Sequence, residues 1–352
     1  MKNKKALLIY GQYVTFVKRD HEILKNLDFE VKNLHFKGDK KLGKMLLSFT
    51  SQLFFLITKG HKYDVFYIWF ADYHAYLPVL FSKIYRKKTI LIIGGYDAAK
   101  IEEINYGVFC KKKSQVFCAR FAIKNSNHIL AVDQSLIKGE NQYDKKTPTG
   151  IKNFVKNIKG NIEVLPTCYD KNVWKPNPKI NRLDNHVISV GNAYDLSTFK
   201  RKGFDFLKEI AYKMPNVTFT IVGVSGYAYD LLMDNKPKNL NIIGFVNQEE
   251  LIEEYSKHKV FAQLSLNEGL PNTLCEAMFC GCIPVGSSVN GIPNAVGGSH
   301  LIVQKKDIKE AIKVINHALS QTRSKHDFFI KYAKKKYPLE LRENRIKDIL
   351  LS

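Results

Sequence analysis

Short apolar runs alternate with amphipathic stretches from one end of this chain to the other, and this alternation limits the possible folds more than any other feature. The amphipathic stretches have helical periodicity, as in Phe204–Lys213, Gln248–Ser256, Thr273–Phe279 and Asp307–Ser320. Strands that alternate with helices form parallel sheets with helices on both faces, so the sequence predicts an α/β protein. The strand candidates are Ala6–Tyr10, Val65–Phe70, Thr89–Ile93, His128–Val132, Ile162–Leu165, Val187–Val190, Val217–Val222, Leu240–Ile243, Val260–Leu264, Ile283–Val285 and Leu301–Val303.

The length indicates two domains. A chain of 352 residues is longer than one hydrophobic core usually serves. The segment Lys175–Asp184 (KPNPKINRLD) is rich in Pro and Asn and contains no strand candidate. We therefore expect one doubly wound domain over residues 1–180 and a second over residues 181–322.

Basic residues are concentrated in the first half. The formal net charge is +22, with 33 Lys and Arg against 15 Asp and Glu in residues 1–182, 13 against 14 in residues 183–322, and 9 against 4 in residues 323–352. Such a field attracts nucleic acid, an anionic membrane surface or phosphorylated substrates. Solvated lysines without a partner are the alternative. No helix-turn-helix, zinc or RNA-recognition motif accompanies the charge, which argues against nucleic acid.

The apolar segments are too short for a membrane-spanning helix, which needs roughly 18 consecutive apolar residues. The apolar run in the opening MKNKKALLIYG is shorter than a signal-peptide core and predicts a first buried strand. Met45–Ile57 predicts a buried helix, with a surface membrane anchor as the alternative. Six cysteines without a CxxC pair indicate a reduced cytoplasmic protein, and no residue cluster has the spacing of a metal site; the cysteines are Cys110, Cys118, Cys168, Cys275, Cys280 and Cys282.

Residues 265–286, SLNEGLPNTLCEAMFCGCIPVG, carry the clearest chemistry. They predict a turn after a strand, a helix that opens at Pro271 in its first position and ends at Gly281, and then the next strand. The start of this helix is expected at the carboxyl edge of a parallel sheet, where ligands of such folds bind. Its free N–H groups near Leu270–Thr273 and its dipole suit a nucleotide diphosphate.

Two glutamates flank this helix start. The Glu276 side chain leans toward the N-terminus of the helix and can accept two hydrogen bonds from a ribose diol. Glu268 precedes the helix and can reach another part of the same ligand. A bare pair of glutamates would be read as solvated charges, but the surrounding residues make this pattern specific; they are Gly269, Pro271, Asn272, Ala277, Gly281 and Pro284.

This segment resembles the E-x7-E signature of glycosyltransferase family 4, the glycosyl transferases group 1 domain, in the form common in bacterial surface-polysaccharide enzymes. Further similar pieces occur in family order: Ile162–Pro176 (IEVLPTCYDKNVWKP), Val190–Phe206 with KRKGF, Phe219–Gly223 (FTIVG) and Ile242–Val246 (IIGFV). The resemblance covers nearly the whole chain and is strongest from about 160 to 300. It implies the GT-B fold, with two Rossmann-like domains facing across a cleft and a last helix, within 323–352, that crosses back to the N-terminal domain.

The resemblance also implies roles for individual residues. Glu276 binds the nucleotide ribose, Glu268 approaches the hydroxyls of the transferred sugar, and Lys202 contacts the diphosphate with Arg201 beside it. The family often has Arg after the first Gly of the C-terminal domain, where this chain has Asn192, so either Arg201 supplies the second positive charge or diphosphate binding is weaker. The remaining donor contacts are expected from the backbone at Gly244, Phe245 and Val246 for the base, and at Gly269, Leu270, Pro271, Asn272 and Thr273 for the phosphates and sugar.

The acceptor side is less defined. Many family members place a His at the end of an N-terminal-domain strand, where this chain reads GGYDAA. Asp97 in this stretch either meets a sugar hydroxyl or an acceptor proton, or caps a local turn. His74 either lines the cleft or packs inside the domain. Residues 105–107 (NYG) are further candidates for acceptor contact.

The function implied by the resemblance is retaining transfer of a sugar from a nucleotide sugar, with UDP the expected nucleotide, to a hydroxyl acceptor. The expected acceptor is a lipid-linked glycan in cell-surface polysaccharide synthesis, used by a cytoplasmic protein bound to the inner face of the membrane. No DxD motif occurs, so we expect no metal cofactor. The alternatives are an inverting transferase or sugar-nucleotide epimerase of the same fold, a silent binding module and, more distantly, a basic nucleic-acid-binding protein.

Overall fold

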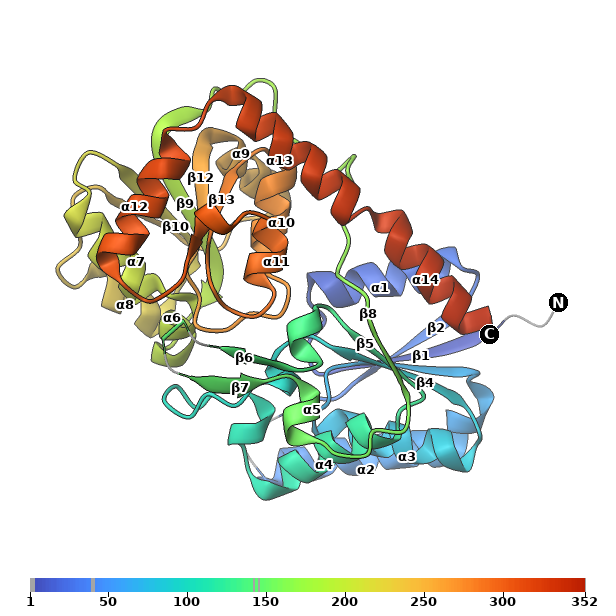
Figure 1. Cartoon of the computed structure of the whole chain (residues 1–352). Coiled ribbons are helices and arrows are strands. Elements are labelled where there is room, and N and C mark those ends of the chain that lie inside the picture. The colour runs from blue at the N-terminus through green and yellow to red at the C-terminus, as the bar shows by residue number, and fades with distance from the viewer. Residues whose placement is uncertain (1–3, 39–41, 142, 145, 352) are drawn as a thin grey trace. The chain divides into compact units, whose positions relative to one another are not determined.

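The chain forms two compact units in the computed structural model, which describes residues 4–38, 42–141, 143–144 and 146–351 (Figure 1). Unit 1 consists of Met1–Gly139, Pro148–Pro166 and Arg342–Ser352, and unit 2 of Glu140–Thr147 and Thr167–Leu341. The division at Pro166 lies before the Pro- and Asn-rich link, which belongs to unit 2. Only the last residues of the basic tail belong to unit 1.

Unit 1 contains a six-stranded parallel sheet with the order β2-β1-β3-β4-β5-β8. Its interior strands are buried on both faces and therefore read as continuous apolar runs in the sequence. The edge strand β2 has a mixed burial pattern and therefore contains no continuous apolar run, so the sequence did not predict it. The strands are β1 (Lys5–Tyr10), β2 (Glu30–His35), β3 (Val65–Trp69), β4 (Lys88–Ile93), β5 (His128–Ala131) and β8 (Asn161–Val164).

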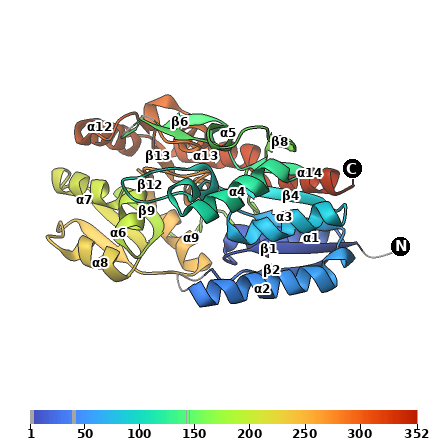
Figure 2. The same ribbon diagram turned by 90° about the horizontal axis from the view of Figure 1, so that it is seen from below.

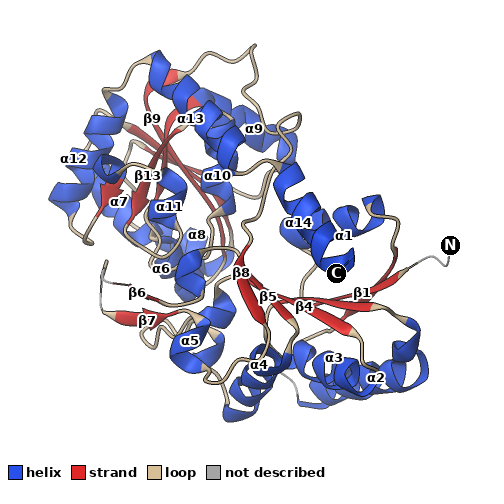
Figure 3. Cartoon of the chain, turned by 45° about the vertical axis from the view of Figure 1, so that its right-hand side comes forward, coloured by secondary structure: helices blue, strands red, loops and turns tan. Residues whose placement is uncertain are grey.

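Helices cover both faces of this sheet. One face carries α1 (Thr15–Asn26) and α14 (Leu339–Leu351), and the other carries α2 (Leu42–Lys59), α3 (Tyr73–Ile84) and α4 (Lys113–Asn125) (Figure 3). Shorter helical turns connect these elements: η1 (Gly60–Lys62), η2 (Tyr96–Ala98), η3 (Val108–Cys110), η4 (Gln134–Leu136) and α5 (Ile151–Phe154).

A buried ion pair fastens α14 to unit 1. Arg342 donates from Nε and from a terminal nitrogen to the two carboxylate oxygens of Asp20 in α1, each at 2.7 Å, and also donates to the carbonyls of Leu165 and Pro166. Tyr67 and Trp69 donate to the same carboxylate at 2.7 and 2.9 Å. Because every partner is hydrogen bonded, the buried charges are compensated; removing one of them would cost about 3–5 kcal/mol.

Unit 2 contains a second six-stranded parallel sheet, with the order β11-β10-β9-β12-β13-β14. The strands are β9 (Leu183–Ala193), β10 (Thr218–Val224), β11 (Leu240–Ile243), β12 (His258–Gln263), β13 (Ile283–Ser287) and β14 (Ile302–Val303). Each of the six strand runs predicted in this half of the chain overlaps one of these strands. With two Rossmann-like parallel sheets, the predicted α/β class is confirmed.

The helices of unit 2 also lie on both faces of its sheet. On one face α7 and α12 pack together, and on the other α10 packs against α13 (Figures 1 and 3). The helices are α6 (Leu196–Lys202), α7 (Phe204–Lys213), α8 (Gly226–Met233), α9 (Gln248–Lys257), α10 (Asn272–Phe279), α11 (Ile292–Val296), α12 (Ile308–Leu319) and α13 (Arg323–Lys336), with the turn η5 (Ser299–Leu301). A small hairpin of β6 (Gly139–Asn141) and β7 (Thr147–Thr149), which the sequence reading missed, lies outside both sheets.

The prediction of a buried helix at Met45–Ile57 is wrong for one face of α2. Gln52 and Leu56 are buried, but Leu47 and Phe54 are 69% and 70% exposed. Across the described residues, no helix combines the length and apolar character needed to cross a bilayer. Five of the six cysteines are buried, and all six are free thiols.

Candidate functional site

The site lies at the carboxyl edge of the unit 2 sheet, where strand order changes direction. β10 and β11 continue from β9 on one side, and β12 to β14 continue on the other. The loops that follow β9 and β12 therefore diverge at this point, which is where open α/β sheets bind ligands. The predicted strand–turn–helix–strand unit is present as β12, the loop from Leu264 to Pro271, α10 and β13.

Helix α10 begins one residue later than predicted. Pro271 is the N-cap with extended backbone (φ −74°, ψ 102°), and the helix starts at Asn272. The predicted end at Gly281 is confirmed: this glycine has a φ of +87°, its N–H donates to the carbonyl of Met278, and the N–H of Cys282 donates to the carbonyl of Ala277. The first N–H groups of such a helix have no acceptor within it, so the start of α10 offers donors to an anion.

Three charged side chains converge beside this helix start. Lys202 Nζ lies 2.7 Å from Glu268 Oε1, and an Arg201 terminal nitrogen lies 3.4 Å from the same oxygen. Ser265 Oγ donates to it at 3.2 Å. The three charged side chains are only 12–14% exposed. The structure thus brings together the three residues predicted to handle the transferred sugar and the diphosphate.

Glycine makes this convergence possible at the end of α6. Gly203 ends α6 in the left-handed region, with a φ of +70°, and α7 starts directly after it. A Cβ at Gly203 would lie 2.0 Å from the carbonyl oxygen of Leu264, so any side chain there would collide with the loop after β12. The N–H of Leu266 donates to the carbonyl of Arg201 at 2.8 Å and ties this loop to the helix end. In the pair Lys202–Gly203, the lysine supplies charge and the glycine allows close packing against the loop after β12.

A second glycine, Gly191 near the end of β9, seats the stem of Lys202. A Cβ on this glycine would lie 2.8 Å from Lys202 Cε and 2.9 Å from Cδ. In the sequence, Gly191 served only to locate Asn192, the residue after it. Its position between an apolar strand and the charged KRK run was the signal that could have marked it.

The surroundings of the cluster favour the ionised form of Glu268 and disfavour the ionised form of Lys202. Burial raises the pKa of Glu268, but Lys202 and Arg201 outweigh it, and the net pKa lies below its usual value. Burial and the neighbouring Arg201 lower the pKa of Lys202, while Glu268 opposes them. Two cations share one carboxylate, so the cluster carries an excess of positive charge that suits a phosphate ligand.

Asparagines support the loop that carries Glu268. Asn290 Nδ2 donates to Asn267 Oδ1 at 2.8 Å and to the carbonyl of Glu268 at 2.9 Å. The N–H of Gly291 donates to the carbonyl of Gly269 at 3.2 Å. Asn290 and Ser265 were not singled out in the sequence; their places, in the loop after β13 and at the head of the signature segment, were the available signals.

The other residues predicted around α10 lie at its start. Glu276 is buried in the second turn. Thr273 Oγ1 donates to the carbonyl of Val190 at 3.3 Å, and Asn272 Oδ1 accepts from Tyr169 at 2.6 Å. Because these side chains bond to the protein, their backbone N–H groups are the parts suited to a ligand. Leu270 and Pro271 are buried beside them.

The residues predicted for the base lie at the same edge of the sheet. Asn192 is exposed near the end of β9, and Phe245 and Val246 follow β11 after Gly244. Phe245 is 92% exposed, which is unusual for a phenylalanine. The carboxyl ends of parallel strands share one edge, so these residues lie on the same side of unit 2 as Glu268.

In unit 1 the geometry of Asp97 favours the turn-cap alternative. Its carboxylate is fully buried and accepts from the N–H groups of Ala71, Gly94 and Gly95 at 3.0–3.1 Å. Burial raises the pKa of Asp97 to about 6 even though these N–H groups oppose the shift. With its oxygens committed to the backbone, Asp97 is placed to hold the turn after β4 rather than to meet a substrate.

His74 and the NYG segment are also built into unit 1. His74 is buried, its Nε2 lies 2.7 Å from the carbonyl of Trp69, and burial lowers its pKa. Gly107 has a φ of +96° and lies against the carbonyl of Ala99. Tyr106 and Ile101 pair through two backbone hydrogen bonds. The packed alternative for His74 fits this geometry, and the NYG segment forms a turn.

Comparison with protein families gives one match over this part of the chain. Residues 170–336 match the family model described as glycosyl transferases group 1. A curated relative, alpha-galactosylglucosyldiacylglycerol synthase of Streptococcus pneumoniae, is 33% identical over 136 residues. This match covers 34% of the chain and 36% of the relative, so it spans about a third of the relative's length.

Solved structures resemble the chain over nearly its full length. Sucrose-phosphate synthase from Thermosynechococcus elongatus has a TM-score of 0.75 at 13% identity, with 98% of each chain covered. Anabaena Alr3699/HepE, solved in complex with UDP and glucose, has a TM-score of 0.72 at 14% identity, with 99% of each chain covered. At such identities the likeness shows the fold, which is the GT-B fold of glycosyltransferases.

Proposed function

We propose that this chain, whose residues 170–336 form a glycosyl transferases group 1 domain, is a glycosyltransferase that binds a nucleotide sugar at the carboxyl edge of unit 2. One observation carries the proposal: Lys202 and Arg201 converge on Glu268 beside the start of α10. Partly buried cations and helix N–H groups at the switch point of a parallel sheet are suited to a diphosphate.

The donor is held in parts by different elements. The diphosphate lies near Lys202, Arg201 and the first N–H groups of α10. The ribose diol donates to Glu276, and the base lies near Phe245 and the backbone at Val246. Glu268 accepts from hydroxyls of the transferred sugar, because its lowered pKa keeps it ionised as an acceptor.

In the transfer step the bond between the anomeric carbon and the diphosphate oxygen breaks, and a bond from the acceptor oxygen to the same carbon forms. Negative charge grows on the departing diphosphate, where the ammonium of Lys202 stabilises it. We propose that the acceptor proton passes to a phosphate oxygen on the same face of the sugar, which gives retention at the anomeric carbon. No described side chain is then required as the base.

We propose UDP as the nucleotide and a lipid-linked glycan as the acceptor. The support for UDP is the likeness to a protein solved with UDP and glucose, and the support for a lipid-linked acceptor is the curated relative whose name is that of a diacylglycerol glycoside synthase. The basic unit 1 fits an acceptor carried on an anionic surface, at the inner face of the membrane.

The test begins with a thermal-shift screen of nucleotides and nucleotide sugars, because ligand binding to the folded chain raises its Tm. We expect UDP to raise the Tm of the wild type and a Lys202→Ala variant to lose most of this shift. Incubation of the matching UDP-sugar with short-chain lipid glycosides, followed by NMR of the anomeric proton, then reports transfer and configuration. No Tm response to any nucleotide would overturn the proposal, and an inverted product would leave transfer intact but exclude retention.

Metal dependence is tested in the same assay. Group 1 glycosyltransferases use nucleotide-sugar donors, and among the described residues no cluster of three His, Cys, Asp or Glu side chains has metal-site geometry. We expect transfer to continue in excess EDTA because Lys202 and the helix start occupy the place of a leaving-group cation. A rate that falls in EDTA and returns with Mg²⁺ would contradict this expectation.

A further inference from the structure

Helix α2 presents an unusual outer face. Leu46, Leu47, Leu53, Phe54 and Ile57 are 54%, 69%, 37%, 70% and 54% exposed. At 100° per residue these positions, with Thr50 between them, fall within an arc of about 120° on the helix. The five exposed apolar side chains on this arc are here called the α2 face.

The opposite side of α2 is also committed to apolar packing. Leu56 is fully buried, the ring of Phe49 contacts Phe36 and Tyr73, and the buried Gln52 donates to the carbonyl of His74 at 3.0 Å. A helix in a soluble domain normally turns polar side chains outward when its inner side packs on the protein. The α2 face instead exposes large apolar side chains, which indicates that a binding partner covers it.

The two neighbouring helices also expose large apolar side chains. α2 packs against α3, and α3 against α4, in one layer on a single face of the unit 1 sheet (Figure 2). Ile84 at the end of α3 is 61% exposed, and Phe117 on α4 is 59% exposed. Tyr85 joins the first two helices by donating to the carbonyl of Leu56 at 3.1 Å.

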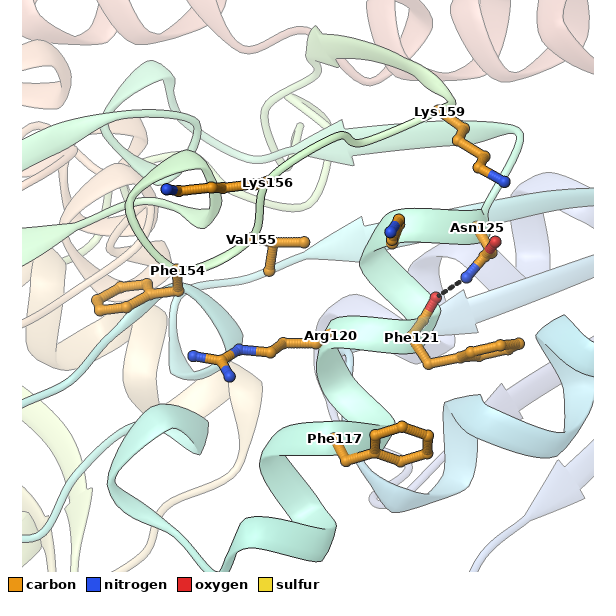
Figure 4. Close-up of a pocket in the computed structure, with 9 residues that line it drawn as sticks. Phe117, Arg120, Phe121, Asn125, Phe154, Val155, Lys156 and Lys159 are labelled. Atoms are coloured by element: carbon orange, nitrogen blue, oxygen red, sulfur yellow. Dashed lines mark hydrogen bonds between the residues drawn. The ribbon is translucent and has the colours of Figure 1, made fainter.

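Cations gather at the far side of the same layer. Arg120 and Lys124 of α4, with Lys156 and Lys159 from the segment before β8, line an open cavity of about 520 Å³ (Figure 4). Phe117, Phe121 and Phe154 supply its apolar wall, and no carboxylate lines it. Among the residues that the structure describes, no acidic side chain forms an ion pair with these four cations.

We propose that the α2–α3–α4 layer is a docking surface for an anionic lipid bilayer: the α2 face inserts among the acyl chains, and the cavity of Arg120, Lys124, Lys156 and Lys159 receives a lipid phosphate. This deepens the proposed membrane association by naming the surface that makes it. Large apolar side chains inserted at the interface and cations beside them are the two contributions that hold peripheral helices on anionic membranes.

The charge pattern favours a bilayer over a second copy of the chain. Lys44 and Lys59 lie near the two ends of α2, and Lys83 and Arg86 lie at the end of α3. Face-to-face pairing of this layer with itself would oppose positive charges and leave the cationic cavity without a counter-charge. A bilayer rich in anionic lipids supplies both the apolar interior and the phosphates.

The apolar part is tested by sedimentation of the full chain with vesicles of phosphatidylglycerol and phosphatidylcholine in equal amounts. We expect a Leu47→Ser/Phe54→Ser double variant to bind at least about tenfold more weakly than the wild type, because the two most exposed apolar groups of the helix are lost. Met233→Ser, at a side chain 45% exposed on α8 in unit 2, is the matched control and should bind as the wild type does. Circular dichroism and Tm confirm that each variant is folded.

The cationic part is tested with Arg120→Glu/Lys124→Glu, with Lys238→Glu in unit 2 as the charge control. We expect the double charge reversal to abolish the preference for anionic over pure phosphatidylcholine vesicles and to remove most of the salt dependence. Equal binding by the wild type and both double variants would overturn the proposal. So would a dimer in light scattering, without vesicles, that the Leu47→Ser/Phe54→Ser variant dissociates.

Donor hydrolysis in the absence of lipid separates this inference from the transferase proposal. All surface variants should hydrolyse or bind the nucleotide sugar as the wild type does, since none of the changed residues lies in unit 2's donor site. Loss of vesicle binding with intact donor binding supports the docking surface. Intact vesicle binding by a chain that binds no nucleotide would leave the surface in place and overturn the transferase.

Discussion

The two sheets of this molecule share an architecture but differ at the place where strand order reverses. In unit 1 the reversal lies between β1 and β3, and in unit 2 between β9 and β12. Unit 2 places Arg201, Lys202 and Glu268 there. Unit 1 places aromatic rings there instead: Phe16 packs on Trp69 with centroids 4.5 Å apart and on Phe70 at 5.8 Å.

In both units the scaffold fixes the location of a site, and the loop residues fix its chemistry. Charged groups suit the phosphates of a donor. Aromatic rings suit the apolar face of a sugar or lipid-linked acceptor. Phe70 strengthens this reading, because it has a φ of +68°, a strained conformation for a bulky residue and one that collects at functional sites.

Each reversal point also contains a glycine that makes room for its characteristic side chain. Gly191 accommodates the Lys202 stem, and Gly94, which follows β4, accommodates the ring of Phe70, whose nearest carbon would lie 2.4 Å from an added Cβ. The two glycines provide matched probes of the two halves.

The largest effect is expected from the charged cluster. Lys202→Ala should lower kcat by about 10²–10³-fold, because it removes the cation that we propose stabilises the leaving diphosphate. The measurement is steady-state transfer at saturating donor. Lys213→Ala, at an exposed lysine of α7, is the control and should be neutral. A normal kcat for Lys202→Ala would show that the charged cluster of unit 2 does not act on the leaving diphosphate.

Glu276→Ala should raise the KM for the donor by about tenfold with a smaller change in kcat, since a charge-assisted hydrogen bond contributes about 1.5–3 kcal/mol. Glu253→Ala, at an exposed glutamate of α9, is the control. A normal donor KM combined with a raised acceptor KM would show that Glu276 contacts the acceptor and not the donor.

Substitution of the two glycines tests whether the two reversal points act on different substrates. Gly191→Ala should reduce donor binding or kcat several-fold by displacing Lys202, and Gly94→Ala should raise the acceptor KM by displacing Phe70, with donor binding unchanged. Gly38→Ala, where an added Cβ meets nothing within 4 Å, controls for the substitution itself. Equal effects of both changes on the donor would show that the two reversal points do not act on separate substrates.

The smallest effect is the dependence of stability on pH, which differs in sign between two buried carboxyls. The pKa of Glu268 is lowered in the folded chain, so its stabilisation is present above its ordinary value of 4.5 and is lost as the pH falls below it. The pKa of Asp97 is raised from 3.8 to about 6, so the folded chain binds that proton more tightly and loses stability as the pH rises through this range.

Tm measurements of Glu268→Gln and Asp97→Asn test this contrast. A range from about pH 3.5 to about pH 7 includes the pH values at which the two carboxyls titrate. As the pH falls, the Tm difference between wild type and Glu268→Gln should shrink, and that between wild type and Asp97→Asn should grow. The same trend for both variants would contradict the assignment of opposite shifts.

The sequence predicted what depends on local pattern. Apolar runs predicted the buried strands, and the signature segment predicted α10, its end at Gly281 and the two glutamates beside it. Contacts between distant positions were beyond it: Lys202 meets Glu268 only because Gly203 lets α6 end against the loop after β12. For Met45–Ile57 the sequence left a buried helix and a surface anchor open, because an apolar segment has the same pattern whether its second side is covered or exposed.

The Arg342–Asp20 pair has a consequence for how the chain is made. Asp20 emerges from the ribosome before Arg342, its buried guanidinium partner, which is translated 322 residues later. Until then unit 1 retains a carboxylate without its counter-charge and a sheet with one side uncovered by α14. Unit 2 ends at Leu341, so all of it is translated before unit 1 can be completed, and during that delay chaperones can engage the unfinished unit 1.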